Sequence, residues 1–594
     1  MQTGPHITRQ KFIAVFMGAM WACLAMNTGI IQFLHHDRLY RTAVNQSTMP
    51  VTLKAARGAI VDRNGVEMAV TLSSASYGVW PNKVIDTEVA ARAFARAAGL
   101  DEAEVKTTLA SKKKYLYLVR HADIGTMKKL DAAIDTLDNP LLVKVKAFEK
   151  IPEFKRCYPL GKIGAQVIGY TDVDNRGIEG CELFFNRELA GSDGRSVLLR
   201  DAMQRSDRFL AEPVVEARNG LNVRLTIDWR IQEIAEEELE TAVENARASY
   251  GGVVVLDSST GEILAMANVP RFDPNDPASF NSLDPAYRRN RLVTDMIEPG
   301  STFKVVAFSE ALESGKIRET DMIDCMGGSY RIGSHVINDS HEHGVLTAED
   351  VLVYSSNIGT IKIAERIGKQ KLYERARLLG FGEVTGSDFP NETRGMLPNP
   401  RTWSNLSLPT ISFGQGVAVS PLQIVAAYAA IANGGELLSP RIIRELRDKN
   451  DAAVRRAEIR RIRRVMTRET AARLTGILCA AVDRGTGRTA AIPGVLLAGK
   501  TGTAQRIQEG GKGYAGGKYV SSFIGFNTDR DPKLVCLVMI DSPVGVYYGS
   551  QIAGPVFKNI MNRIISMGNS PLNPHLAEAS PVPERTAVVP APVM

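Results

Sequence analysis

The most prominent hydrophobic pattern is an uncharged segment near the start of the chain. Residues 12–34 carry no charged side chain, and these 23 residues suffice to cross the hydrocarbon core of a bilayer as a helix. The segment ends in large apolar residues such as Phe33 and Leu34, unlike a signal peptide, which ends in small residues before its cleavage site. We therefore expect a transmembrane anchor at 12–34 after a cytoplasmic N-terminus at 1–11. Positively charged residues flank both ends of this segment, so the positive-inside rule barely decides the orientation of the anchor in the membrane.

The region after the anchor alternates short apolar runs with alanine-rich stretches. Ile60 and Val61 lead into Asp-Arg-Asn-Gly at 62–65, which is typical of a strand entering a tight hairpin. An alanine-rich stretch at 88–98 favours a helix. We expect residues 46–224 to form a mixed α/β domain without catalytic signatures.

The pattern changes at about residue 225, where a second domain begins. Two apolar runs at 252–257 and 261–266, joined by Ser-Ser-Thr-Gly, predict a hairpin. Further strands are expected at 519–526 and 534–540. Helices are expected between and after them, at 302–313, 347–354, 421–433, 469–482 and 551–566. Strands from both ends of the region imply an antiparallel sheet flanked by helices, and hence an α+β domain at 225–568. The proline-rich tail at 569–594 is expected to be disordered.

Composition and charge exclude several functional classes. With 594 residues, 44% hydrophobic and 23% charged, the chain is an ordinary folded protein of two or three domains. A net charge of +7 is too small to indicate a nucleic-acid partner. The arginine-rich segment at 455–468 favours a charged loop and helix face over contact with an anionic surface.

The sequence predicts neither a metal site nor a cofactor. The six cysteines lack zinc-binding spacing, although Cys157 and Cys181 could pair in an oxidising compartment. The string His341-Glu342-His343 has no further ligand nearby, so we interpret it as polar loop residues.

Three short strings carry the candidate chemistry: Ser301-Thr302-Phe303-Lys304, Ser355-Ser356-Asn357 and Lys500-Thr501-Gly502. Their order and wide spacing are those of the SxxK, SxN and KTG set of serine acyl-transfer enzymes. Two other matches, at 111–114 and 279–281, lie in a basic run and in a turn-like segment ahead of the nucleophile candidate. Only the set at 301, 355 and 500 has the required order.

Each string has a chemical interpretation. A helix that begins at or just after Ser301 places Lys304 on the same face, one turn away. Lysine accepts a proton from serine only when burial or a neighbouring cation lowers its pKa, and Lys500 could supply that cation. Ser355 and Asn357 would relay a proton and bind the substrate backbone, although taken alone they favour plain helix capping.

The segment at 494–501 matches the P-loop pattern GxxxxGK[ST]. A P-loop must open a helix after its lysine, whereas here a glycine-rich stretch follows that cannot remain helical. We therefore expect a strand that carries Lys500, Thr501 and Thr503 along a cleft, where they would bind a carboxylate.

Over roughly residues 10–568 the chain resembles the class B penicillin-binding proteins, most closely the division-type, FtsI-like D,D-transpeptidases. The resemblance rests on the anchor, the three strings and these further motifs: Arg57 to Gly65, Tyr158-Pro159, Ile168-Gly169-Tyr170-Thr171-Asp172, Gly177-Ile178-Glu179, Thr226-Ile227-Asp228 and Phe413-Gly414-Gln415-Gly416. It implies an elongated pedestal (dimerisation-type) domain and a penicillin-binding domain of the β-lactamase-like serine transpeptidase fold.

The resemblance also assigns roles to residues. It implies Ser301 as nucleophile, Lys304 as its base, and Ser355 and Asn357 as proton relay and substrate clamp. Lys500, Thr501, Gly502 and Thr503 would form the carboxylate-binding strand, and the amides of Ser301 and Thr503 would form the oxyanion hole.

The implied reaction is septal cross-linking of peptidoglycan stem peptides that end in D-Ala-D-Ala, with β-lactams acylating the same serine. Implied partners are a lipid-linked glycosyltransferase and other division proteins, with the bulk of the chain on the periplasmic side of the bacterial cytoplasmic membrane. The alternatives are an elongation-type transpeptidase, a D,D-carboxypeptidase with the same site, and a catalytically idle scaffold.

Overall fold

The computed structural model describes residues 5–137, 139, 141–143, 147–200, 206–209, 215–507 and 514–567. The chain divides into two compact units, Met1–Ala56 with Gly191–Gly220, and Arg57–Ala190 with Leu221–Met594. The expected disordered tail at 569–594 lies outside the described residues.

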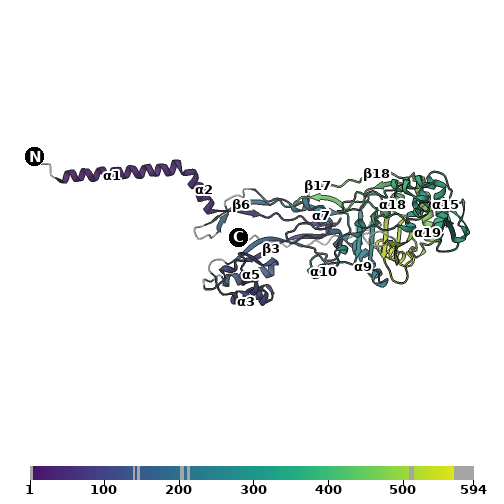
Figure 1. The fold of residues 1–594 in the computed structure, drawn as a ribbon, viewed down its shortest axis with the longest axis horizontal. Coiled ribbons are helices and arrows are strands. Elements are labelled where there is room, and N and C mark those ends of the chain that lie inside the picture. Colours follow the sequence, from purple (N-terminus) through teal and green to yellow (C-terminus); the bar gives the residue numbers. More distant parts are fainter. Residues whose placement is uncertain are drawn as a thin grey trace. The chain divides into compact units, whose positions relative to one another are not determined.

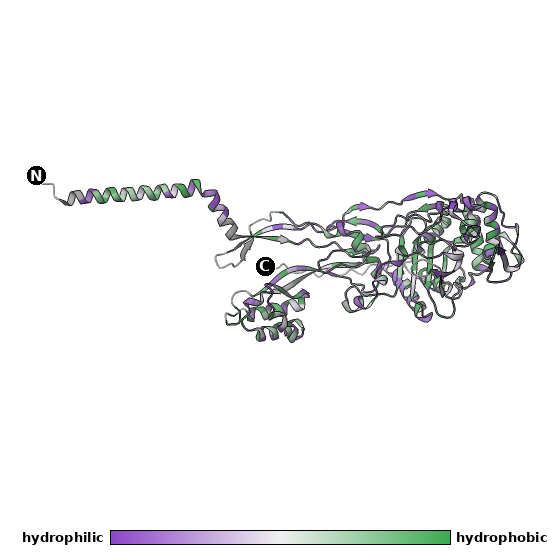
Figure 2. Ribbon diagram, viewed as in Figure 1, coloured by the Kyte–Doolittle hydropathy of each residue, from purple (hydrophilic) through white to green (hydrophobic). Residues whose placement is uncertain are grey.

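The first unit contains the apolar N-terminal helix and a small sheet. Its elements are α1 (Pro5–Gly29), a π-helical turn at Ile30–Leu34, α2 (His36–Ser47), β1 (Thr48–Leu53), β6 (Gly194–Arg200) and β7 (Ser206–Phe209). The strands form an antiparallel sheet in the order β1-β6-β7. The helical span Arg9–Leu34 has 26 residues and a mean hydropathy of 1.6, and Figure 2 shows its mainly hydrophobic colouring. It is long and apolar enough to cross a membrane.

A seven-stranded mixed sheet organises the first part of the second unit. Its order is β17-β16-β8-β2-β3-β4, with β5 also pairing β3. The strands are β2 (Ile60–Val61), β3 (Glu67–Val79), β4 (Leu116–Ala122), β5 (Phe148–Cys157), β8 (Asn222–Leu225), β16 (Ile443–Arg447) and β17 (Ala453–Arg456). The predicted hairpin at 60–65 is confirmed: Asp62 accepts hydrogen bonds from the amides of Asn64 and Val66, and Gly65 has a φ of 89°.

Helices pack on this sheet around a separate apolar cluster that contains Tyr77, Phe94 and Leu130. They are α3 (Thr87–Ala98), α4 (Glu102–Leu109) and α5 (Ile124–Leu137), with the 3-10 turn η2 (Pro81–Lys83) and the short helices α6 (Ala165–Ile168), α7 (Gly180–Phe184) and α8 (Asn186–Ala190) further along. The alanine-rich helix expected at 88–98 is α3.

A five-stranded antiparallel sheet organises the rest of this unit, in the order β10-β9-β21-β20-β19. The strands are β9 (Tyr250–Asp257), β10 (Ile263–Val269), β19 (Leu497–Ile507), β20 (Tyr514–Asn527) and β21 (Leu534–Asp541). Successive residues of β9 point to opposite faces, with Val253 and Val255 in one apolar cluster and Val254 and Leu256 in another. Both faces of the sheet are therefore buried in apolar clusters. This agrees with the prediction of an antiparallel sheet that is flanked by helices.

Helices form the two outer layers of this domain (Figure 1). The helices α9 (Trp229–Asn245) and α20 (Ala553–Ser566) cover one face, and α13 (Lys304–Glu313) and α18 (Pro421–Ala432) cover the other. The remaining helices are α10 (Pro277–Ser282), α11 (Pro285–Arg288), α12 (Arg291–Thr294), α14 (Ala348–Val353), α15 (Asn357–Ile367), α16 (Lys369–Leu378), α17 (Ser407–Ser412) and α19 (Arg468–Asp483).

Short strands and 3-10 turns complete the domain. They are η3 (Gly300–Phe303), β11 (Met322–Asp324), η4 (Met326–Gly328), β12 (Ser329–Ile332), β13 (His335–Asn338), β14 (Val345–Thr347), η5 (Pro400–Thr402), β15 (Glu436–Leu438), β18 (Arg461–Arg464) and η6 (Arg488–Ala490). The arginine-rich segment, expected as a loop and helix face, also contributes two strands, β17 and β18. Arg463 and Arg464 pair there with Glu383 and Glu436, each at 2.8 Å.

Candidate active site

The three strings meet at one cavity of about 450 Å³. It is lined by Gly300, Ser301, Asn338, Asp339, Ser340, His341, Ser355, Asn357, Phe413, Gln415, Thr486, Thr501, Thr503, Tyr548, Gly549, Ser550 and Gln551. Lys304 and Lys500 are fully buried and reach the cavity through the hydroxyl of Ser355. The first residues of the three strings, Ser301, Ser355 and Lys500, lie 54 to 199 positions apart in the sequence and are thus brought to one place by the fold.

Ser301 lies in a tight turn whose backbone is held by a glycine contact. Gly300 has a φ of 54° and donates its amide to the carbonyl of Gly414 at 3.1 Å. A Cβ on Gly414 would lie 2.2 Å from the Gly300 carbonyl oxygen, so only glycine fits there. The turn is the 3-10 segment η3. The α-helix was expected to start at residue 302, but it starts at Lys304.

Lys304 is completely inaccessible to solvent at the first turn of α13. Its Nζ donates to the Oγ of Ser355 at 3.1 Å and to the carbonyl of the same residue. Burial lowers the pKa of Lys304 to about 7, against the opposing effects of Asp339 and Cys325. A substantial fraction of neutral amine is therefore present near pH 7, as a general base requires.

Lys500 lies on β19, also without solvent exposure. Its Nζ donates to the Ser355 Oγ at 2.8 Å and to the carbonyl of Thr501 at 3.2 Å. Burial, followed by the charge of Lys304, lowers the pKa of Lys500 well below its usual value. The sequence suggested that the charge of Lys500 lowers the pKa of Lys304. In the structure, burial is the principal cause of the lowered pKa of Lys304.

The Ser355-Ser356-Asn357 string follows the end of a helix, α14, as the sequence predicts, and it also leads into a second helix, α15, which the sequence did not reveal. Ser355 follows α14 with a left-handed φ of 61°, a strained conformation for a residue with a side chain. Ser356 is the N-cap of α15, with its Oγ accepting from the amide of Gly359 at 2.9 Å, and Asn357 is the first helical residue. Capping therefore belongs to Ser356, which leaves the Ser355 and Asn357 side chains at the cavity.

Asp339 holds this string in place and was missed by the sequence reasoning. Its carboxylate accepts from the Ser356 Oγ at 2.6 Å and from the amides of Asn357 and Ile358. A carboxylate at a helix N-terminus stabilises the helix through the exposed amides and the helix dipole. The apolar spacing of Ile358, Ile361 and Ala364 is the signal that could have revealed α15.

The Lys500-Thr501-Gly502 string lies on a strand, which confirms that 494–501 is not a P-loop. β19 pairs with β20 over its length. A Cβ on Gly502 would lie 2.3 Å from the Ser522 Oγ and 2.9 Å from the Thr302 Cγ2, so the strand lies directly against the turn that carries Ser301. A Cβ on Gly300 would lie 2.9 Å from the Thr503 carbonyl oxygen, so the Thr503 backbone lies against the residue that precedes Ser301.

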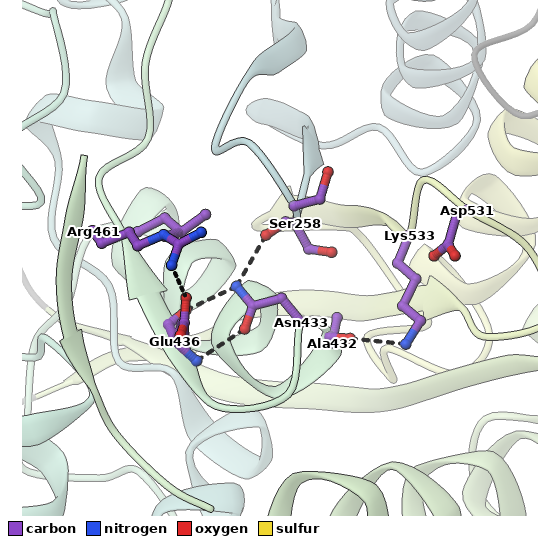
Figure 3. Close-up of a pocket in the computed structure, with 9 residues that line it drawn as sticks. Ser258, Ala432, Asn433, Glu436, Arg461, Asp531 and Lys533 are labelled. Carbon is purple, nitrogen blue, oxygen red and sulfur yellow. Dashed lines mark hydrogen bonds and ion pairs between the residues drawn. The ribbon is translucent and has the colours of Figure 1, made fainter. Parts of the chain in front are cut away.

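A second cavity, of about 290 Å³, shows the contrast with the first (Figure 3). Asn433 donates to the carbonyls of Ser258 and Glu436, and Lys533 donates to the carbonyl of Ala432. Arg461 pairs with Glu436 at 3.6 Å. These side chains pair with one another and with backbone carbonyls, and none of the three strings lines this cavity.

Among the described residues, possible metal ligands do not group together and the cysteines do not pair. Within the described ranges, no three His, Cys, Asp or Glu side chains are grouped closely enough to hold a metal ion. Cys157 and Cys181 are free thiols, so the pairing considered from the sequence does not form.

Two family models match the chain: the penicillin binding protein transpeptidase domain, over residues 251–562, and the penicillin-binding protein dimerisation domain, over residues 52–225. The chain is a class B penicillin-binding protein. The enzyme class of this penicillin-binding protein is that of the serine peptidoglycan D,D-transpeptidases.

Named relatives of this penicillin-binding protein span nearly its whole length. It is 35% identical to the probable peptidoglycan D,D-transpeptidase PenA of Neisseria gonorrhoeae, over 97% of this chain and 95% of that protein. It is 30% identical to the peptidoglycan D,D-transpeptidase FtsI of Escherichia coli K12, over 94% of this chain and 92% of that protein. The crystal structure of penicillin binding protein 3 of Mycobacterium tuberculosis with aztreonam superposes with a TM-score of 0.67 at 29% identity, covering 89% of this chain and 99% of that one.

Proposed function

We propose that this penicillin-binding protein cross-links peptidoglycan stem peptides during septal wall synthesis, through an acyl-enzyme on Ser301. The observation that carries the proposal is the Ser355 hydroxyl, which accepts hydrogen bonds from two fully buried lysines beside the turn that holds Ser301. We assign catalysis to the domain at 225–568 and the pedestal role to residues 46–224.

The first half-reaction is acylation. Neutral Lys304 takes the hydroxyl proton of Ser301 as its Oγ attacks the carbonyl carbon of the D-Ala-D-Ala amide, and the amides of Ser301 and Thr503 bind the oxyanion. Ser355 passes a proton from the lysine pair to the leaving amine, the C–N bond breaks, and D-alanine departs. Asn357 holds the substrate backbone, and Thr501 and Thr503, with Lys500 behind them, bind the terminal carboxylate.

The second half-reaction transfers the acyl group. An amine of a neighbouring stem peptide attacks the carbonyl carbon of the Ser301 ester, and the lysine pair accepts the amine proton through Ser355. The new amide bond forms, the ester bond to the Ser301 Oγ breaks, and the lysine pair returns a proton to that oxygen. β-Lactams would enter as analogues of the donor and form the same ester. A D,D-carboxypeptidase would use the same groups with water as acceptor.

A donor peptide assayed with and without an acceptor amine separates these activities. We expect a cross-linked product that depends on the acceptor and is lost in Ser301→Ala. Hydrolysis alone would favour the carboxypeptidase, and no covalent adduct of any kind would favour the idle scaffold.

The septal role rests on family resemblance. Two relatives carry different names, FtsI in Escherichia coli and stage V sporulation protein D in Bacillus subtilis, the latter 31% identical over 93% of this chain. We propose insertion by α1 in the bacterial cytoplasmic membrane with the bulk of the chain on the periplasmic side, next to a lipid-linked glycosyltransferase and division proteins. A fluorescent fusion in the native cell should gather at the division site, whereas signal along the side wall would favour elongation.

A further inference from the structure

The side chain of Asn357, the substrate clamp of the proposed mechanism, is itself held by another segment. Its Nδ2 donates a hydrogen bond to the backbone carbonyl of Asn338 at 3.1 Å. Asn338 is the last residue of β13, and both residues line the active-site cavity. A carboxamide has one acceptor oxygen and two N–H groups. The bond to Asn338 restricts the rotation of this carboxamide and leaves its oxygen and its second N–H to bind the substrate.

The carbonyl of Asn338 is presented by the two-stranded hairpin of β12 and β13. The hairpin pairs Ser329 with Asn338 at its open end, where the amide of Asp339 also donates to the carbonyl of Gly328 at 3.0 Å. None of the residues 329–338, all of which the structure describes, is buried or belongs to an apolar core cluster. A two-stranded hairpin alone is at best marginally stable in water. Its position therefore depends on contacts with the rest of the domain.

Tyr330 of β12 makes two such contacts. The Nζ of Lys362 lies 3.9 Å from the centroid of the Tyr330 ring, which is a cation–π contact. The Tyr330 hydroxyl donates to the Oε1 of Glu365 at 3.2 Å. Both partners belong to α15, the helix whose first residue is Asn357. Tyr330 thus fastens the hairpin to the same helix that carries the clamp.

We propose that Tyr330 is a positioning residue, which sets the orientation of the Asn357 carboxamide through the β12–β13 hairpin. Asn357 touches the substrate in this account, whereas Tyr330 lies outside the cavity and acts only through Asn338. This inference rests on the proposed function. It goes beyond the three strings, because it assigns the orientation of the clamp to a contact made outside all of them.

The hairpin has a different task from that of Asp339. The Asp339 carboxylate accepts from the amides of Asn357 and Ile358, so it fixes the backbone at the start of α15. The carboxamide of Asn357 can still rotate about its side-chain bonds when only the backbone is fixed. The Asn338 carbonyl removes this freedom, and a side chain that is held in place before the substrate arrives loses less entropy on binding.

The test compares Tyr330→Ala, which removes both contacts with α15, with Tyr330→Phe, which keeps the ring over Lys362. Each variant is made in the otherwise wild-type chain and in Asn357→Ala. The full-length chain in detergent is acylated with benzylpenicillin, whose side-chain amide the clamp would bind, and adducts are followed by intact-protein mass spectrometry. The matched control is Tyr373→Ala, which removes a half-buried tyrosine of α16 outside the cavity.

We expect Tyr330→Ala to lower the acylation rate constant about tenfold in the otherwise wild-type chain, the effect of one hydrogen bond of ordinary strength. In Asn357→Ala the same change should lower the rate constant less than about twofold, because the side chain that the hairpin orients is gone. Tyr330→Phe should lower the rate constant at most about threefold. Tyr373→Ala should stay within about twofold of the wild type.

Two outcomes would overturn the inference. Tyr330→Ala could be acylated as fast as the wild type, or it could lose rate by the same factor with and without Asn357, which would indicate a merely structural role. A wild-type chain that forms no adduct on Ser301 with benzylpenicillin would instead overturn the proposed function, and this inference with it.

Discussion

Replacing Lys304 by methionine should abolish acylation and at the same time stabilise the transpeptidase domain. Lys304 has no solvent exposure, and its pKa falls from an ordinary 10.5 to about 7. At ~1.36 kcal/mol for each pH unit, retaining this lysine destabilises the folded state by about 4–5 kcal/mol near pH 7. Methionine fills a similar volume without a charge, and it loses two hydrogen bonds to Ser355, each contributing about 1 kcal/mol. The net stabilisation is about 2 kcal/mol, or about 3 °C in Tm for a domain of this size.

The stability difference between Lys304→Met and the wild type should depend on pH. Between about pH 7 and 10.5 the unfolded chain holds the proton that folded Lys304 has lost, so wild-type stability rises with pH across that window. The advantage of the variant is therefore full below pH 7 and falls to about zero near pH 9.5.

Scanning calorimetry of the full-length chain at pH 7 and pH 9.5 measures the effect. Ser301→Ala serves as the control, because on the proposed mechanism it should abolish acylation while it leaves the buried amine of Lys304 in place. A lower Tm for Lys304→Met at pH 7, or an advantage that does not shrink toward pH 9.5, would refute the reasoning.

Three further predictions follow from the site and the pedestal. Acylation of the wild type by a penicillin should slow as the pH falls through about 7, because protonated Lys304 cannot accept the serine proton; a stopped-flow rate that is constant from pH 5 to 8 would contradict this. Gly502→Ala should slow acylation about 100-fold, since its Cβ would lie 2.3 Å from the Ser522 Oγ and displace β19, while the control Gly516→Ala, which meets no atom within 4 Å, should be acylated normally. Glu182→Gln should destabilise the pedestal by about 3–5 kcal/mol, because two buried arginines lose their carboxylate; an unchanged Tm would argue against this.

The sequence was most informative where a pattern is local. The hairpins at 60–65 and 252–266 and the helices at 421–433 and 469–482 depend on periodicity and turn residues within a few positions, and the structure has them within a few residues of the expected bounds. The glycine-rich stretch after Lys500 excluded a P-loop for the same reason, because helix propensity is a local property.

The contacts that position the site could not be predicted, because they join distant segments. Asp339 caps α15 from the end of β13, and Thr486 reaches Thr501 from the end of α19. Neither residue belongs to a motif, and their partners are defined only after the sheet and helices pack. The cause of the Lys304 pKa likewise needed the structure, since complete burial cannot be distinguished from partial burial in a sequence.

The central claim is that Ser301 is the acylated nucleophile of this cavity. Peptide mapping by mass spectrometry, after the full-length chain has been incubated with benzylpenicillin at pH 8, tests it most directly. We predict a single adduct on the peptide that contains Ser301 and no adduct in Ser301→Ala. An adduct on another residue, or a Ser301→Ala chain that is acylated as fast as the wild type, would contradict the account.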